Sequence, residues 1–229
     1  MRFHDAGARV AGAVVDLVIP TICGGCGAPG TRWCRRCALV FADTPIELRT
    51  SVVLPVPAYA LGRYTAARRR AILELKEHGR TDLTVPIGCA LATALRTLDR
   101  WAELPRSARL VLVPAPTRWW AARRRGGDPV TALAAAAAGE LGSGVCVMPA
   151  LFTSSWARDS AGLSAPARGE NLSGAVRLRR GADLSACGGG AAVVLVDDVL
   201  TTGSTAAHSI EVLRRAGIQV HLVLVVAAA

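Results

Sequence analysis

The sequence predicts an α/β fold in which a parallel sheet is flanked by helices. Residues 191–196 form a continuous apolar run rich in valine, which is typical of a strand buried on both faces of a parallel sheet. Strand candidates alternate with helix candidates through the second half of the chain, as they do in βαβ units. The 229 residues are 52% hydrophobic and 19% charged, so the chain has enough apolar side chains for a sizeable core.

A small N-terminal unit is expected over residues 1–45, followed by the α/β domain over residues 46–229. The first twenty residues are expected to form an amphipathic helix that ends at Pro20. Its apolar side chains recur on one face at helical spacing: Val10, Val14, Leu17 and Val18. A cysteine-rich segment follows over residues 21–40.

The main domain is expected to begin with a polar linker over residues 42–50 and an edge strand over residues 51–57. Prolines are tolerated in an edge strand because its outer N–H groups have no sheet partner. Helices are expected at 65–78, capped by Gly79, and at 86–101, 129–141 and 205–216. Strands are expected at 109–113, 145–147, 175–178, 191–196 and 218–226.

The formal charge of the chain is +10, and its basic residues are 26 arginines and a single lysine, Lys76. This excess suits an anionic substrate or nucleic acid, although an arginine-rich surface also follows from codon usage alone. No run of about 18 uncharged apolar residues is present, so we predict no membrane span. Asp16 interrupts the apolar stretch at 10–19, and no small-residue cleavage site follows it, so we expect a cytoplasmic protein.

Four of the seven cysteines form two C-x-x-C pairs separated by seven residues: Cys23 with Cys26, and Cys34 with Cys37. Four thiolates at this spacing can converge on a tetrahedral Zn²⁺ ion and leave no open coordination position. We therefore predict a structural zinc site, with redox dithiols or disulfides as the alternative. The basic residues around the second pair form either a nucleic-acid contact or a solvated face: Arg32, Arg35 and Arg36, beside Trp33.

The main functional motif lies at residues 193–205. A buried strand is expected to deliver Asp197 and Asp198 at its C-terminal end, and a loop rich in threonine and glycine then opens a helix. Ligands of open α/β sheets bind beyond the carboxyl ends of the strands. N–H groups at a helix N-terminus suit a phosphate, and paired carboxylates can hold ribose hydroxyls or Mg²⁺. The alternative is a capped helix after a strand, with the aspartates as turn residues.

This motif resembles the phosphoribosyl-diphosphate signature of the type I phosphoribosyltransferases. The resemblance implies that Asp197 and Asp198 lie by the ribose hydroxyls and that the loop at 201–205 cradles the 5-phosphate. From Cys23 to the C-terminus the chain also resembles the ComF family (ComFC or GntX-like), which joins an N-terminal zinc knuckle to a phosphoribosyltransferase-like domain. The expected fold class is therefore a type I phosphoribosyltransferase-like parallel sheet flanked by helices, with a small N-terminal zinc knuckle.

Two segments in the middle of the chain carry the ComF resemblance further. Tyr64 and the segment 72–79, which contains Lys76, resemble the family's tyrosine and its lysine-glycine helix end. A compact amine is expected to be required at Lys76, since arginine is used everywhere else; a surface lysine without a role is the alternative. Pro114 and Ala115 resemble the family's short turn on the diphosphate side.

Two arginine-bearing segments complete the resemblance. Arg125 and Gly126 match the family's Arg-Gly-Phe-Asn segment, in which Gly127 and Asp128 here replace the aromatic residue and the amide. Arg158 begins a segment that resembles the family's mobile loop. Basic residues on such a loop can close over a diphosphate and shield it from water.

The resemblance implies a protein that binds phosphoribosyl diphosphate or a ribose 5-phosphate nucleotide with Mg²⁺, and that can transfer phosphoribosyl to a nitrogen acceptor. The residues expected to act in catalysis are Asp197, Asp198, Lys76 and Arg125. The residues expected to bind the ligand are Asp197, Asp198, Thr201, Thr202, Gly203, Ser204, Thr205, Pro114, Ala115 and Arg158. The alternative is a non-catalytic, competence-related adaptor in DNA uptake or processing, with single-stranded DNA or DNA-uptake proteins as partners.

Overall fold

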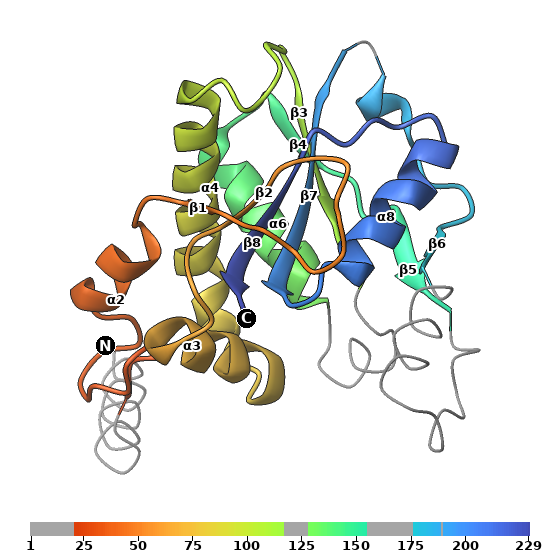
Figure 1. Cartoon of the computed structure of the whole chain (residues 1–229). Helices are drawn as coiled ribbons and strands as arrows, with labels where there is room; N and C mark the ends of the chain where they lie inside the picture. The colour runs from red at the N-terminus through yellow and green to blue at the C-terminus, as the bar shows by residue number, and fades with distance from the viewer. Residues whose placement is uncertain (1–20, 117–127, 155–175, 189) are drawn as a thin grey trace, which may run out of the picture.

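A six-stranded sheet forms the centre of the computed structural model, which describes residues 21–116, 128–154, 176–188 and 190–229 (Figure 1). The strand order is β1-β2-β8-β7-β3-β4, and every neighbouring pair is parallel except β1, which is antiparallel to β2. The strands are β1 (Ile46–Glu47), β2 (Ala58–Ala60), β3 (Leu110–Pro114), β4 (Val145–Val147), β7 (Ala192–Leu200) and β8 (Leu222–Ala228). The predicted α/β fold with a mostly parallel sheet is therefore confirmed.

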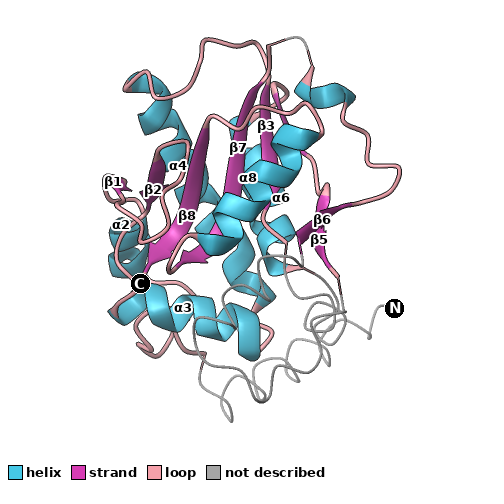
Figure 2. Ribbon diagram, turned by 45° about the vertical axis from the view of Figure 1, so that its right-hand side comes forward, coloured by secondary structure: helices cyan, strands magenta, loops and turns pink. Residues whose placement is uncertain are grey.

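Helices cover both faces of this sheet (Figure 2). One face packs against α8 (Ser204–Arg215), and the other packs against α4 (Thr84–Arg100) and α6 (Pro129–Leu141). Side chains of β7 alternate between the two cores, as the period of two in a strand requires: Val194 and Val196 face α4 and α6, whereas Val193 and Leu195 face α8. The central strand is thus buried on both sides, as its apolar run predicted.

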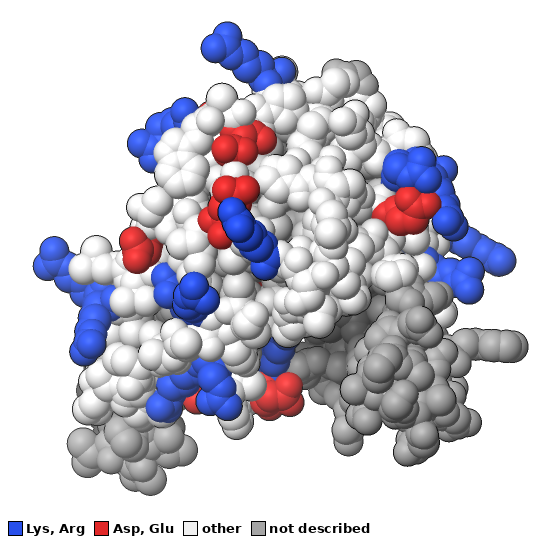
Figure 3. Space-filling model, viewed as in Figure 1, with Lys and Arg blue, Asp and Glu red and all other residues white. Residues whose placement is uncertain are grey.

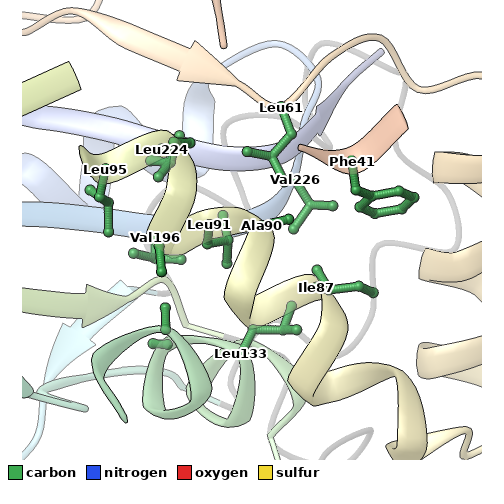
Figure 4. Packing of buried hydrophobic residues seen from close by; sticks show 14 of the residues in the cluster. Phe41, Leu61, Ile87, Ala90, Leu91, Leu95, Leu133, Val196, Leu224 and Val226 are labelled. Atoms are coloured by element: carbon green, nitrogen blue, oxygen red, sulfur yellow. The ribbon is translucent and has the colours of Figure 1, made fainter. Parts of the chain in front are cut away.

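The N-terminal cysteine segment is joined to the main core by the short helix α2 (Arg35–Phe41). Phe41 is fully buried, and Figure 4 shows it in the same apolar cluster as Ile87 of α4 and Val226 of β8. Helix α3 (Ala66–Glu77) lies across the carboxyl ends of the strands in Figure 1, and the 3-10 turn η1 (Thr81–Leu83) links it to α4. Ala71, Ile72 and Leu75 bury the inner face of α3.

A separate two-stranded antiparallel sheet pairs β5 (Leu151–Thr153) with β6 (Val176–Leu178), and a short 3-10 turn, η2 (Ser185–Cys187), precedes β7. The strand expected at 175–178 therefore exists, but it lies outside the main sheet. Within the described ranges, no helix combines the length and the apolar character that crossing a bilayer requires.

The four helices expected after residue 60 and most of the expected strands are confirmed to within a few residues, but two expectations for the first half are wrong. Residues 51–57 are a loop, and the edge position belongs to β1, inside the segment expected to be a polar linker. Proline has no backbone N–H to donate to a neighbouring strand, so this segment does not pair in the sheet. It crosses over other elements instead. The helix expected at residues 1–20 falls outside the described residues.

Candidate functional site

The acidic pair and the only lysine of the chain meet at the carboxyl end of the sheet. Asp197 and Asp198 lie within β7, which continues to Leu200, and Lys76 lies in the last turn of α3. The Lys76 ammonium is 2.6 Å from Oδ2 of Asp198, and the two side chains are 28% and 8% exposed. Two residues that the sequence singled out separately are therefore in direct contact, in a place with little water.

The surroundings of Asp197 disfavour the charged form of its carboxyl group. The protein around it removes most of its hydrating water, and Asp198 adds a second negative charge, so the pKa of Asp197 is raised well above its usual value. The backbone N–H of Asp198 donates to Asp197 Oδ1 over 2.8 Å and partly offsets the rise, as does the Lys76 charge. A single ammonium thus balances the charge of two adjacent carboxyl groups. Because one negative charge can remain uncompensated, the arrangement favours cations and hydroxyl donors as ligands.

The loop after β7 turns sharply into α8 at Gly203. This glycine has φ 91° and serves as the N-cap of the helix, a left-handed conformation that other residues adopt only with strain. The N–H of Ser204 donates to Thr202 Oγ1 over 3.3 Å, and the hydroxyls of these two residues are 3.0 Å apart. Thr201, Thr202 and Thr205 are exposed, so hydroxyls surround the N-terminus of α8 on its open side.

A segment that the sequence did not predict packs on this loop. The connection between β1 and β2, residues 48–57, crosses in front of β7 and β8 in Figure 1. Here the N–H of Val52 donates to the Thr202 carbonyl over 3.0 Å. A Cβ added to Gly203 would lie 3.2 Å from Cβ of Thr50. We call residues 48–57 the crossing segment; it fixes one side of the threonine-glycine loop and leaves the hydroxyl side open.

The turn after β3 lies beside the acidic pair. Pro114 pairs with Val196 in the parallel register of β3 and β7, and the N–H of Ala115 donates to the Val196 carbonyl over 2.7 Å. Both residues are buried, and Pro114 pairs with the residue that directly precedes Asp197. Arg125 and Arg158, which were also expected at the site, fall outside the described residues.

The four cysteines of the N-terminal unit form a compact cluster. Their Sγ atoms all lie within 4.8 Å of one another, with 3.7 Å between Cys23 and Cys37 and 3.6 Å between Cys26 and Cys34. Zinc bound tetrahedrally at about 2.3 Å from each sulfur would place the sulfurs about 3.8 Å apart. All four cysteines are free thiols rather than disulfides. The cluster therefore has the ligand set and the spacing to hold a structural metal ion such as zinc.

The pKa values of these thiols are also consistent with a bound metal ion. Burial raises the pKa of Cys23, but hydrogen bonds from the N–H groups of Cys26, Cys34 and Gly25 outweigh it and lower the pKa to about 6. Burial raises the pKa of Cys37, and the neighbouring sulfurs of Cys34 and Cys23 raise it further. Without a cation, at least one of the four thiols resists ionisation, which a thiolate-bound metal would reverse.

The surface around the cluster is basic. Arg32, Arg35 and Arg36 are all exposed, and Lys and Arg side chains gather in Figure 3 over the region that α2 occupies in Figure 1. Trp33 does not join this surface as a free aromatic platform. Its ring packs edge-on against Phe41, with 4.9 Å between the ring centroids.

Comparison with known proteins does not assign the chain to a family. No protein-family profile matches the chain, and no curated protein sequence matches it. The geometry of Lys76, the acidic pair and the threonine-glycine loop, together with the cysteine cluster, is therefore the basis for any function assigned to the chain.

Proposed function

We propose that this chain is a type I phosphoribosyltransferase-like protein of the ComF family, which binds phosphoribosyl diphosphate or a ribose 5-phosphate nucleotide. The observation that carries the proposal is the order of groups at the carboxyl end of β7. A central buried strand presents the acidic pair, with Lys76 on Asp198, and leads through Gly203 into the N-terminus of α8.

The 5-phosphate is assigned to the threonine-glycine loop. The first N–H groups of a helix lack intrahelical partners, and the helix dipole adds partial positive charge there. The exposed hydroxyls of Thr201, Thr202 and Thr205 supply further donors. This surface is open to solvent, whereas the opposite side of the loop is held by Val52 of the crossing segment.

The ribose is assigned to the acidic pair. Carboxylates accept hydrogen bonds from two neighbouring hydroxyls, and hydroxyl donors relieve the unfavourable charge on Asp197 without demanding a further cation. The contact of 2.6 Å with Lys76 orients the adjacent Asp198 carboxylate. The diphosphate would lie toward Pro114 and Ala115, with Arg125 and Arg158 as the proposed cationic side chains and Mg²⁺ as the accompanying ion.

If the site is catalytic, a nitrogen nucleophile displaces diphosphate from C1 of the ribose. The transition state has ribosyl-cation character, so the task of the protein is to position the two reactants and to stabilise charge. The acidic pair would favour positive charge on the ribose ring, and basic groups would favour the departing diphosphate. The cysteine cluster takes no part in this step, because four sulfur ligands leave a bound metal no open position.

Titration calorimetry with phosphoribosyl diphosphate and Mg²⁺ tests the binding proposal. Wild type should bind, and Asp198→Asn should bind more weakly. Gly203→Val should lose binding, because a branched side chain at φ 91° and beside Thr50 would distort the loop that presents the N–H groups. Equal binding by folded wild type and folded Gly203→Val would exclude the loop as the phosphate site. Release of diphosphate in the presence of a panel of bases tests whether the bound ligand also reacts.

A second candidate function follows from the exposed arginines of the cysteine unit. Arg32, Arg35 and Arg36 form a basic surface on a unit that is itself well suited to a structural metal. Such a surface can contact the phosphates of single-stranded DNA without any sequence preference. The chain would then act as an adaptor in DNA uptake or processing, and its nucleotide-shaped site would bind a ligand without turnover.

A further inference from the structure

Helix α3 contacts both candidate sites of the molecule. Its last turn presents Lys76 to Asp198, while its first half and the turn that follows it contact the cysteine unit. Arg70 and Lys76 are six positions apart, which is about 9 Å along a helix. A helix whose inner face is buried behaves as a stiff rod over this length, so movement at one end is passed to the other.

Arg80 is the main link between the end of α3 and the cysteine unit. Its Nη2 donates to the carbonyls of Ile22 and Arg32 over 3.3 and 3.5 Å, and these two carbonyls flank the first and second cysteine pairs. Asp82 fixes the guanidinium through two hydrogen bonds of 2.8 Å. The same bonds hold the pKa of Asp82 below its usual value, so the pair is charged at neutral pH.

Arg68, Arg70 and Leu83 also pack against the N-terminal unit. Arg68 donates to the Val40 carbonyl and lies 5.8 Å from the centroid of the Phe41 ring. A Cβ added to Gly27 would lie 2.6 Å from Nη1 of Arg70, so this glycine allows the guanidinium to pack on the backbone of the first cysteine pair. A Cβ on Gly24 would collide with Leu83 at 2.5 Å. The loops that carry the cysteines therefore pack directly on α3 and η1.

We propose that α3 couples the cysteine cluster to the acidic pair, so that a cluster holding its metal keeps Lys76 on Asp198 and loss of the metal releases it. The carbonyls that Arg80 contacts lie beside the two C-x-x-C turns, which a bound metal would hold together. When these turns separate, Arg80 and Arg70 lose these contacts, and the last turn of α3, which carries Lys76, can shift although Ala71 and Ile72 stay packed on the core. The consequence for ligand affinity rests on the function proposed above, whereas the coupling itself does not.

The single lysine makes this coupling directly measurable. Amine-reactive labelling followed by peptide mapping reports on Lys76, because the only other primary amine is the chain terminus, which maps to a different peptide. In the zinc-loaded protein the ammonium is paired and reacts slowly. After chelation of the metal, labelling should be faster by about tenfold, as expected when a charged hydrogen bond is broken. Far-UV circular dichroism establishes that the α/β domain is still folded.

Two arginine variants decide the question without removal of the metal. Arg80→Ala retains all four cysteines but deletes the link, so labelling should rise while zinc content stays the same. Arg96→Ala is the matched control, because Arg96 also pairs with a carboxylate and a carbonyl, those of Glu140, but on the far pair of helices α4 and α6. Its labelling rate should equal that of wild type. Asp198→Asn should label quickly whatever the zinc content.

The coupling is wrong if folded zinc-free protein and Arg80→Ala both label at the wild-type rate. If chelation unfolds the chain, the comparison of Arg80→Ala with Arg96→Ala decides alone, and equal rates overturn the proposal. Calorimetry with phosphoribosyl diphosphate then separates the two proposals. Faster labelling with no ligand binding by wild type retains the coupling and rejects the proposed function, whereas ligand binding with unchanged labelling rejects only the coupling.

Discussion

The ammonium of Lys76 lies 2.6 Å from a carboxylate oxygen of Asp198, and it is the only lysine in a chain that otherwise uses arginine. Asp198 is almost fully buried, and its neighbour Asp197 carries a second carboxyl group. A guanidinium is wider and planar, whereas an ammonium is a compact charge that fits beside two adjacent carboxylates. The pair thus explains the use of lysine at this position by geometry.

Replacement of Lys76 by methionine should destabilise the protein by about 1–3 kcal/mol, because the charge of Asp198 is left nearly buried without a partner. Lys76→Arg should lose less, since the positive charge remains. Urea unfolding with an unchanged slope measures the difference. Stability of Lys76→Met equal to that of wild type would show that the ion pair contributes nothing, and the Lys76 assignment would then lack its physical basis.

Asp197→Asn should stabilise the fold at pH 7. The pKa of Asp197 is raised on folding, so its contribution to stability is fully present below its unfolded pKa of 3.8 and is lost as pH rises through the higher folded value. At pH 7 wild type therefore carries a charge that folding disfavours, and asparagine removes it. In a chain of this size each 1 kcal/mol raises Tm by about 2–4 °C.

Thermal unfolding at pH 7 and pH 4 tests the sign of this effect. The advantage of Asp197→Asn should shrink at pH 4, where the carboxyl of wild type is protonated. Asp99→Asn, at an exposed position in α4, serves as the control and should leave Tm unchanged at both pH values. A variant that is less stable than wild type at pH 7 would contradict the raised pKa.

The purified protein should contain about one Zn²⁺ ion per chain, because four thiolates at tetrahedral spacing favour zinc. Cys34→Ser should lose the metal, whereas its hydroxyl can still cap α2 by accepting the N–H of Cys37, so the start of that helix should be retained. Elemental analysis of this variant is compared with that of Cys146→Ser, a cysteine outside the cluster. Absence of zinc from wild type, or an iron–sulfur absorption spectrum, would remove the assignment.

The second half of the fold could be predicted because its local signals agree with its packing. Helix α6 has the predicted bounds, since Pro129 favours a first helical turn and Asp128 caps it by accepting the N–H of Val130. Strand β7 was predicted from its valine run, but its continuation through Asp197 to Leu200 was not. There β7 pairs with β8, and that pairing depends on residues distant in sequence.

The contacts of the site could not be predicted, although most of its residues were. Lys76 and Asp198 were each singled out, but their pairing depends on where α3 packs. Residues 51–57 of the crossing segment were expected to form an edge strand because prolines and apolar residues alternate there. The contact of Thr50 with Gly203 is purely tertiary. Arg80 and Asp82 were missed; their spacing allows an ion pair, but the sequence gives no sign of the carbonyls that Arg80 binds.

Binding of single-stranded DNA, if it occurs at the cysteine unit, should weaken steeply as salt increases, because each bound phosphate releases counterions. Replacement of Arg32, Arg35 and Arg36 by glutamine should flatten the slope by about 0.7 for each phosphate that is no longer neutralised. Fluorescence anisotropy at several salt concentrations measures both quantities. The same number of replacements at Arg100, Arg214 and Arg215, which are exposed elsewhere, forms the control. Equal slopes for the two triple variants would exclude the unit as the DNA-binding surface.

The fit between Gly203 and the crossing segment can be measured with a second glycine as reference. Gly203 and Gly217 both have positive φ, 91° and 79°, so alanine at either position should cost about 1–2 kcal/mol of backbone strain. A Cβ on Gly217 meets nothing within 4 Å, whereas one on Gly203 meets Cβ of Thr50 at 3.2 Å. Gly203→Ala should therefore lose more stability than Gly217→Ala in urea unfolding.

A double-mutant cycle assigns the additional destabilisation to its cause. Thr50→Gly removes the Cβ that alanine at Gly203 would crowd, so the double variant should recover the part of the destabilisation that exceeds Gly217→Ala. The same Thr50→Gly change combined with Gly217→Ala should show simple additivity, because these two positions do not touch. If the cycle with Gly203 is also additive, the crossing segment moves aside at no cost in free energy. It would then not be what holds the threonine-glycine loop with its hydroxyl side open to a phosphate.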